Sequence, residues 1–215
     1  GRLFDLTLNI AQLELANKII ETGKPVIIIM LEGRPRVITE IEPKAKGVLL
    51  GFLPGMEGGD AIADVLFGDV NPSGKLPITY PNAPNGITLY DYKPIEKFDG
   101  NDYKPLYPFG FGLSYTSFEY SNLKISSQEI TENDELIVKI DVKNTGNRVG
   151  KEVVQLYLTD MYGSVTRPNK QLKAFEKVLL NPGQLKTVEF KLNKQHLSFI
   201  GIDNKRIVEP GDFKV

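Results

Sequence analysis

Residues 51–80 read GFLPGMEGGDAIADVLFGDVNPSGKLPITY and indicate the fold class of the first part of the chain. Glycines at positions 51, 55, 58 and 59 crowd a turn, where positive φ angles or close backbone approach are needed. Apolar residues at helical spacing then predict a helix that starts near Asp60, a residue that can cap or charge its first turn, and ends at Gly68. The turn at residues 71–74 precedes the apolar run 76–79, which is predicted as a strand. The stretch therefore predicts a strand–helix–strand unit.

A second helix is predicted upstream, over residues 9–23. Asn9 is suited to the N-cap and Gln12 follows three residues later, the spacing of a capping box, while Gly23 and Pro25 end the segment. The predicted apolar face comprises Ile10, Leu13, Ala16 and Ile20, widened by Leu15 and Ile19.

The strands that accompany these helices are short and apolar. Residues 26–30 (VIIIM) form a continuous run of the kind found in a strand buried on both faces of a parallel sheet, and residues 48–50 predict another strand. Strands that alternate with helices at this spacing indicate βαβ units. Residues 1–80 are therefore predicted to be part of an α/β sandwich domain with flavodoxin-like βαβ units.

Residues 81–114 show neither helical nor strand periodicity. Prolines are mixed there with aromatic residues that need burial, so we expect an ordered connector that wraps a neighbouring element. The aromatic residues are Tyr90, Tyr92, Phe98, Tyr103, Tyr107 and Phe109.

From about residue 115 the pattern acquires a period of two. Residues 135–142 (ELIVKIDV), 153–158 and 188–192 alternate apolar with polar side chains, and turn sequences separate such segments. Repeated short strands of this kind indicate an immunoglobulin-like β-sandwich over residues 115–215. The aromatic residues Tyr115, Phe118 and Tyr120 are expected to pack between the two domains.

Composition excludes several classes of function. The chain of 215 residues has a net charge of -1, which offers no electrostatic basis for binding nucleic acid or an anionic membrane. Without cysteine it can form neither disulfides nor thiolate metal sites. His196 is its single histidine and is expected at the surface or in a turn of the sandwich. The longest apolar run, residues 26–31, is too short to span a membrane. We expect no metal and no cofactor.

The motifs of this chain resemble those of glycoside hydrolase family 3, the β-glucosidase group. The resemblance rests on GMEGGDAIADVLFGDVNPSGKLPITYP, GKPVIIIMLEGRP, YPFGFGLSYTSFEY, VKNTGNRVGKEVVQLYL, RPNKQLKAFEKVLLNPGQ and VEPGDFKV, which occur in the family's order over nearly the whole chain. It implies the C-terminal part of the α/β sandwich domain followed by a fibronectin type III-like domain. It also implies a retaining, exo-acting enzyme that removes terminal β-D-glucosyl residues from β-glucosides or oligosaccharides.

The resemblance further implies that the catalytic groups lie outside this sequence. Retaining glycosidases use two carboxyl groups, one as nucleophile and one as acid/base. In the family the nucleophile is an aspartate of an N-terminal barrel domain, and the acid/base glutamate precedes a segment resembling GRLFDLTLN at residues 1–9. We therefore expect a C-terminal fragment that contributes no catalytic residue. Arg2 and Asp5, nearest the expected glutamate, are the predicted substrate-binding residues.

Other candidate residues are predicted to have structural roles. We expect Glu57 to hold backbone amides at a helix N-terminus, Asp64 to lie on a solvated helix face, and Arg34 and Arg36 to fix loops or form ion pairs. Residues 68–76 (GDVNPSGKL) are similar to a phosphate-binding loop, but the glycine spacing is wrong and Leu76 stands where Ser or Thr is required. Nucleotide binding is not predicted.

Two alternatives remain open at this point. One is a non-catalytic module in which the β-sandwich binds carbohydrate or protein. The other is a β-xylosidase or N-acetylhexosaminidase of the same family. The resemblance also suggests a periplasmic or secreted protein.

Overall fold

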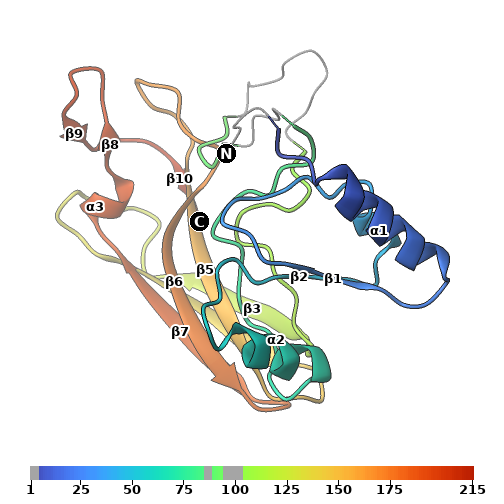
Figure 1. Cartoon of the computed structure of the whole chain (residues 1–215). Coiled ribbons are helices and arrows are strands. Elements are labelled where there is room, and N and C mark those ends of the chain that lie inside the picture. Colours follow the sequence, from blue (N-terminus) through green and yellow to red (C-terminus); the bar gives the residue numbers. More distant parts are fainter. Residues whose placement is uncertain (1–4, 85–88, 94–103) are drawn as a thin grey trace. The chain divides into compact units, whose positions relative to one another are not determined.

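The computed structural model describes residues 5–84, 89–93 and 104–215 (Figure 1). The chain forms two compact units. The first comprises the described parts of residues 1–70, 76–90 and 101–111, and the second comprises those of residues 71–75, 91–100 and 112–215. No single cut in the chain separates these units. The domain limits expected from sequence, 1–80, 81–114 and 115–215, stay a prediction.

In the first unit, helix α1 (Ile10–Glu21) begins with the predicted capping box. The Asn9 side chain accepts a hydrogen bond from the Ala11 amide at 2.9 Å, and Gln12 accepts one from the Asn9 amide. Of the predicted apolar face, Leu13, Ala16 and Ile20 pack against the core of the unit. The prediction is wrong for the remaining three residues, which are exposed: Ile10, Leu15 and Ile19.

Strands β1 (Ile27–Met30) and β2 (Gly47–Leu50) pair in parallel, as predicted. A 3-10 helix, η1 (Glu42–Lys44), lies between them in sequence. The prediction that β1 is buried on both faces is wrong. Ile27 and Ile29 are 52% and 40% exposed, because the core of this unit lies against the opposite face of the strand, at Ile28 and Met30.

Helix α2 (Gly58–Phe67) follows β2 after a glycine-rich turn, in agreement with the sequence pattern. Gly68 ends the helix with φ 88°, a left-handed conformation that glycine adopts without steric cost. Gly58 satisfies a different requirement, since a Cβ there would lie 2.6 Å from the Cγ atom of Pro54. Both positions explain why the turn and the helix end need glycine.

Residues 76–79 are not a strand, so the last element of the predicted strand–helix–strand unit is wrong. The backbone there still bonds to residues 106–111: the Leu76 amide donates to the Phe111 carbonyl, and the Tyr80 amide to the Tyr107 carbonyl, both at 2.8 Å. Pro77 interrupts this pairing because it has no amide hydrogen. Between these two described segments, the β-bridge is limited to Tyr80 and Tyr107.

The described part of the expected connector is packed rather than extended. Tyr107 packs on the core of the first unit and stacks with Phe111 at a centroid distance of 5.0 Å. Tyr90 contacts Phe109 edge to face at 4.8 Å. Phe98 and Tyr103 lie outside the described residues.

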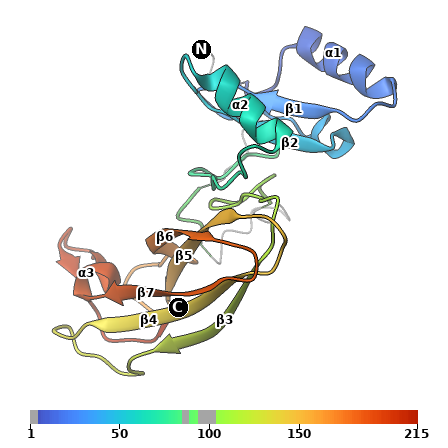
Figure 2. The same ribbon diagram turned by 90° about the horizontal axis from the view of Figure 1, so that it is seen from below.

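The second unit is a sandwich of two antiparallel three-stranded sheets, shown from another side in Figure 2. One sheet has the order β3-β4-β7 and the other the order β10-β5-β6. The strands are β3 (Phe118–Ile125), β4 (Leu136–Asn144), β5 (Gly150–Asp160), β6 (Gln171–Leu180), β7 (Leu185–Leu192) and β10 (Phe213–Lys214). A short helix and a two-stranded sheet complete the unit: α3 (Lys194–Leu197), β8 (Phe199–Ile200) and β9 (Arg206–Ile207).

The alternating residues of these strands build the sandwich core. Val142 of β4, Leu180 of β6 and Leu192 of β7 are completely buried, whereas their sequence neighbours point to the opposite face. The predicted β-sandwich is therefore confirmed. Together the units give the expected fold class, an α/β part followed by an all-β part.

Candidate functional site

Residues 5–7, which include the predicted substrate-binding residue Asp5, lie beside the loop that follows β1. Thr7 and Val37 form a parallel β-bridge, and the Val37 amide donates to the Leu6 carbonyl at 2.8 Å. The Nη1 atom of Arg36 lies 3.5 Å from the Asp5 carbonyl oxygen and 3.4 Å from that of Thr7. In open α/β sheets, ligands bind beyond the carboxyl ends of the strands, and this loop leaves the carboxyl end of β1.

Asp5 itself is exposed and stabilises a local turn. Its Oδ1 atom accepts hydrogen bonds from the amide of Thr7, at 2.9 Å, and from the hydroxyl of Thr7. Arg2 lies outside the described residues. Binding of substrate by Arg2 and Asp5 therefore stays a prediction. Arg36 has the loop-fixing role expected for it, whereas Arg34 is exposed and forms no ion pair within the described parts of the chain.

A buried carboxyl group lies in the same loop. Glu32 is only 9% exposed and Tyr80 only 2%. The Tyr80 hydroxyl lies 2.9 Å from Oε1 of Glu32 and 2.8 Å from the carbonyl oxygen of Arg36. Burial raises the pKa of the Glu32 carboxyl, although the Tyr80 hydroxyl and Arg36 both favour its charged form. Burial and the neighbouring Glu32 carboxyl also raise the pKa of Tyr80, which keeps its proton.

A similar tyrosine–glutamate pair lies next to this one. Tyr107 donates its hydroxyl hydrogen to Oε1 of Glu42 at 2.5 Å, and its ring meets that of Tyr80 edge to face at 6.1 Å. Burial raises the pKa of Tyr107. Sequence reasoning singled out neither pair. The available signal was a glutamate, Glu32, placed directly after the apolar run of β1.

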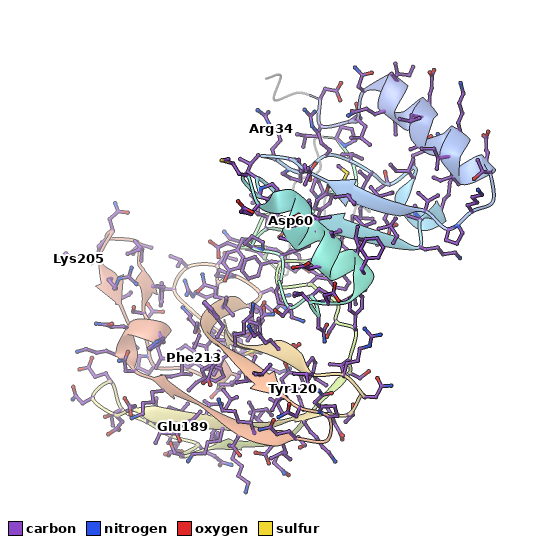
Figure 3. The ribbon with its side chains drawn as sticks, turned by 60° about the horizontal axis from the view of Figure 1, so that its bottom comes forward. Arg34, Asp60, Tyr120, Glu189, Lys205 and Phe213 are labelled. Atoms are coloured by element: carbon purple, nitrogen blue, oxygen red, sulfur yellow. The ribbon has the colours of Figure 1, made fainter. Side chains whose placement is uncertain are left out.

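The loop after β2 and the start of α2 present further charged groups. Glu57 occupies the N-cap position of α2, but its side chain makes no capping hydrogen bond, so the role predicted for it is wrong. Its backbone has φ -83° and ψ 7°, outside the extended region from which N-cap side chains usually reach back to the helix amides. Asp60 lies in the first turn, where its negative charge interacts favourably with the N-terminal end of the helix dipole. Asp64 is exposed, as expected. Figure 3 labels Asp60 and Arg34.

Lys75, the lysine of residues 68–76 that are similar to a phosphate-binding loop, forms an ion pair with Glu152. Lys75 lies 3.3 Å from a carboxylate oxygen of Glu152, and both side chains are nearly buried. Its Nζ atom also donates to the Gly112 carbonyl at 2.8 Å. This lysine therefore serves the second unit as a structural cation.

The aromatic residues at the start of the sandwich make contacts within the second unit. Phe118 packs against the sandwich core, and the Tyr120 hydroxyl donates to Glu152 at 3.0 Å. The guanidinium of Arg148 lies 5.9 Å from the centre of the Tyr115 ring. Packing between the domains stays a prediction for these residues.

His196 has a structural position in α3. Its Nδ1 atom accepts a hydrogen bond from the Asn193 amide at 3.1 Å, and the Asn193 side chain caps the same short helix. Within residues 5–84, 89–93 and 104–215, histidine, cysteine, aspartate and glutamate side chains form no group of three or more that could hold a metal ion. The same residues contain no helix with the length and hydrophobicity needed to cross a membrane.

Comparison with protein-family models gives two matches along the chain. Residues 3–115 match the glycosyl hydrolase family 3 C-terminal domain, and residues 152–215 match a fibronectin type III-like domain. The first match covers more than half of the chain.

Similar proteins and structures are glycosidases by name. A putative β-xylosidase of Formosa agariphila is 44% identical over 95% of this chain and 28% of its own length, and a periplasmic β-glucosidase of Salmonella typhimurium is 40% identical over 98% of this chain and 29% of its own. The structure of a β-glucosidase from Erythrobacter marinus superposes with a TM-score of 0.90 at 41% identity, over 99% of this chain and 29% of that one. The chain thus spans about 30% of the length of these relatives. Both of its parts have the family's sequence and fold, and the chain belongs to glycoside hydrolase family 3.

Proposed function

We propose that this chain is the C-terminal portion of a longer, retaining, exo-acting glycoside hydrolase that removes terminal β-D-glucosyl residues from β-glucosides or oligosaccharides. The observation that carries the proposal is similarity over nearly the whole chain, at 40% identity or more, to relatives named as glycosidases. The relatives include β-glucosidases and β-xylosidases, so a β-xylosidase is the second candidate, favoured by 44% and 42% identity to two such proteins.

In this proposal the chain positions catalytic groups that it does not contain. Retaining hydrolysis needs a nucleophile and an acid/base about 5–5.5 Å apart. The nucleophilic aspartate would belong to an N-terminal barrel domain, and the acid/base glutamate would precede residue 1. Residues 5–8 are hydrogen-bonded to the loop after β1, and this anchoring would hold the glutamate in place. Arg2 and Asp5 would contact the sugar.

The test compares two polypeptides on nitrophenyl β-glucoside and nitrophenyl β-xyloside: the 215-residue chain and the full-length protein. We expect hydrolysis by the full-length protein alone, and its preferred substrate separates the two candidates. In the full-length protein, Glu57→Gln should leave the activity unchanged, because this exposed side chain has no capping partner. Hydrolysis by the short chain, absent from a mock purification, would place the catalytic groups within these residues and contradict the proposal. Inactivity of both polypeptides would favour a binding module.

We further propose that the protein is periplasmic or secreted. A periplasmic β-glucosidase among the relatives supports this location. Cell fractionation tests it: the protein should appear with periplasmic markers or in the medium, and recovery with cytoplasmic markers only would refute the proposal.

A further inference from the structure

The buried carboxyl group of Glu32 has fewer hydrogen-bond donors than an anion requires. Its Oε1 atom meets the Tyr80 hydroxyl, but its Oε2 atom is buried without a hydrogen-bond partner. Burial of an ionised carboxylate is costly unless charge partners and donors compensate for lost hydration, whereas a neutral acid tolerates one unpaired oxygen far better. The surroundings of Glu32 therefore suit a neutral side chain.

The hydrogen count around Tyr80 leads to the same conclusion. Its hydroxyl group has one hydrogen, yet two acceptors lie within bonding distance, Oε1 of Glu32 at 2.9 Å and the Arg36 carbonyl oxygen at 2.8 Å. If Glu32 were ionised, only one of them could receive this hydrogen. If Glu32 carries a proton on Oε1, it donates to the Tyr80 oxygen, and Tyr80 donates to Arg36. Both short contacts are then hydrogen bonds.

We propose that Glu32 keeps its proton at pH values where a free glutamate is ionised, and that the resulting chain of hydrogen bonds, Glu32 to Tyr80 to the Arg36 carbonyl, positions the segment Asp5–Leu8. Glu32 is in this sense a positioning residue. The hydrogen-bonded chain clamps the loop at Arg36, and the next residue, Val37, bonds to Leu6. The Arg36 side chain adds its own contacts to the carbonyl oxygens of Asp5 and Thr7.

The charged groups around Glu32 are few. Burial has the largest effect and raises the pKa of Glu32, although hydrogen bonding from the Tyr80 hydroxyl and the Arg36 backbone, together with the charge of Arg36, favours ionisation. The Tyr80 ring also contacts the ring of Tyr107, whose hydroxyl donates to Glu42. As pH rises and Glu32 ionises, the Tyr80 hydrogen turns to the carboxylate, and the Arg36 carbonyl loses its donor. The clamp is then released on the alkaline side.

The consequence for catalysis rests on the proposed function, in which the acid/base glutamate precedes this segment. The existence of the clamp does not depend on it. We therefore test the clamp by measuring the protonation of Glu32 and the local structure. Neither measurement uses glycosidase activity, so the clamp and the proposed function can fail independently.

The first measurement is infrared difference spectroscopy of the full chain at about pH 6, where ordinary glutamates are ionised. The band of a protonated carboxyl group should be present in the wild type and absent from Glu32→Gln. The control Glu14→Gln, an exposed glutamate of α1, should retain it. If the wild type lacks this band, or if Glu32→Gln retains it, the proposal is overturned. If Glu32→Gln does not fold, Tyr80→Phe should shift the frequency of the band, because the acid loses its acceptor; an unshifted band would contradict the clamp.

The second measurement is exchange of the Val37 amide hydrogen as a function of pH, in wild type and Glu32→Gln. Comparison at equal pH cancels the intrinsic pH dependence of exchange. The two rates should agree at about pH 6. Once its carboxyl band has disappeared, the wild type should exchange about tenfold faster, the change expected when one hydrogen bond is lost. The glutamine cannot ionise and should keep its slow rate. Equal rates throughout the titration of the band would show that Glu32 does not position the segment.

Discussion

Asn144 is a buried amide whose hydrogen-bonding positions are all occupied. Its oxygen accepts from the Thr116 hydroxyl and the Gly146 amide, and its nitrogen donates to the carbonyl oxygens of Arg148 and Leu180. The side chain is 0% exposed. It therefore joins the start of the sandwich, the turn after β4 and the end of β6 through one group.

Asn144→Asp should destabilise the second unit by about 3 kcal/mol or more. Aspartate cannot donate to either carbonyl, and ionisation would bury an unpaired charge. The loss should increase with pH, because the buried acid binds its proton more tightly than the unfolded chain does. Urea unfolding between acidic and neutral pH measures both effects. The exposed Asn133→Asp is the matched control and should change the free energy of unfolding little; an equally small change at Asn144 would show that these contacts contribute little.

Asp141, at the surface of β4, has a lowered pKa, in contrast to the raised pKa expected of a buried aspartate at position 144. Hydrogen bonds from Thr187, on β7, and from Asn122, on β3, lower the pKa of its carboxyl. The interaction favours the folded protein above the unfolded pKa of the group and is lost as pH falls through the folded one.

Thr187→Val should raise the pKa of Asp141 toward its ordinary value, since the larger of the two hydrogen-bond contributions is removed. Carboxyl resonances followed by NMR over the acidic range give the pKa directly. Asp134, whose pKa is lowered by Thr131, provides an internal control and should titrate as in the wild type. An unchanged midpoint for Asp141 would mean that Thr187 is not its stabilising donor.

At the level of elements, helix ends decide local stability in the first unit. The capping box of α1 satisfies amides at its N-terminus, and Gly68 ends α2 with a left-handed residue. These are local features, so substitutions there should affect the helix concerned.

Gly68→Ala should destabilise α2 by about 1–2 kcal/mol, because a left-handed conformation costs this much for a residue with a Cβ atom. Gly59→Ala in the same helix is the matched comparison: a Cβ there meets nothing within 4 Å, and alanine should stabilise the helix by up to about 1 kcal/mol. Amide exchange within α2 measures both. Changes of the same sign would contradict this account of the helix end.

At the level of the whole molecule, parts of the surface of the first unit are apolar. Ile27 and Ile29 of β1 are exposed, as are three apolar residues of α1: Ile10, Leu15 and Ile19. Exposed apolar surface of this kind often marks an interaction site. The proposed longer enzyme offers a protein surface to cover it.

If so, the 215-residue chain should bind a hydrophobic dye such as ANS more strongly, per mole, than the full-length protein does. Replacing Ile27 and Ile29 by threonine should reduce dye binding by the short chain, because threonine keeps the β-branched shape and removes apolar surface. The control is the dye signal of the full-length protein with the same replacements, which should change little. Equal binding by the two wild-type polypeptides would mean that this surface stays open.

Local sequence patterns were sufficient to predict the secondary-structure elements and the fold class. Caps, glycine turns and the periods of apolar residues are set by neighbouring residues along the chain, which is why α1, α2 and the alternating strands of the sandwich could be predicted. Family membership also followed from the order of its motifs. The same local reasoning wrongly predicted a capping role for Glu57, because the backbone at this N-cap is outside the usual extended region.

Which faces are covered and which polar groups meet depends on tertiary packing, and these features could not be predicted. Exposure of Ile27 and Ile29 depends on where the core lies, and Pro77 prevented an apolar run from forming a strand whose partner is some 30 residues away. The contact of Glu32 with Tyr80 joins residues 48 positions apart. No sequence period encodes such a contact, because it depends on how the loop after β1 packs against the rest of its unit.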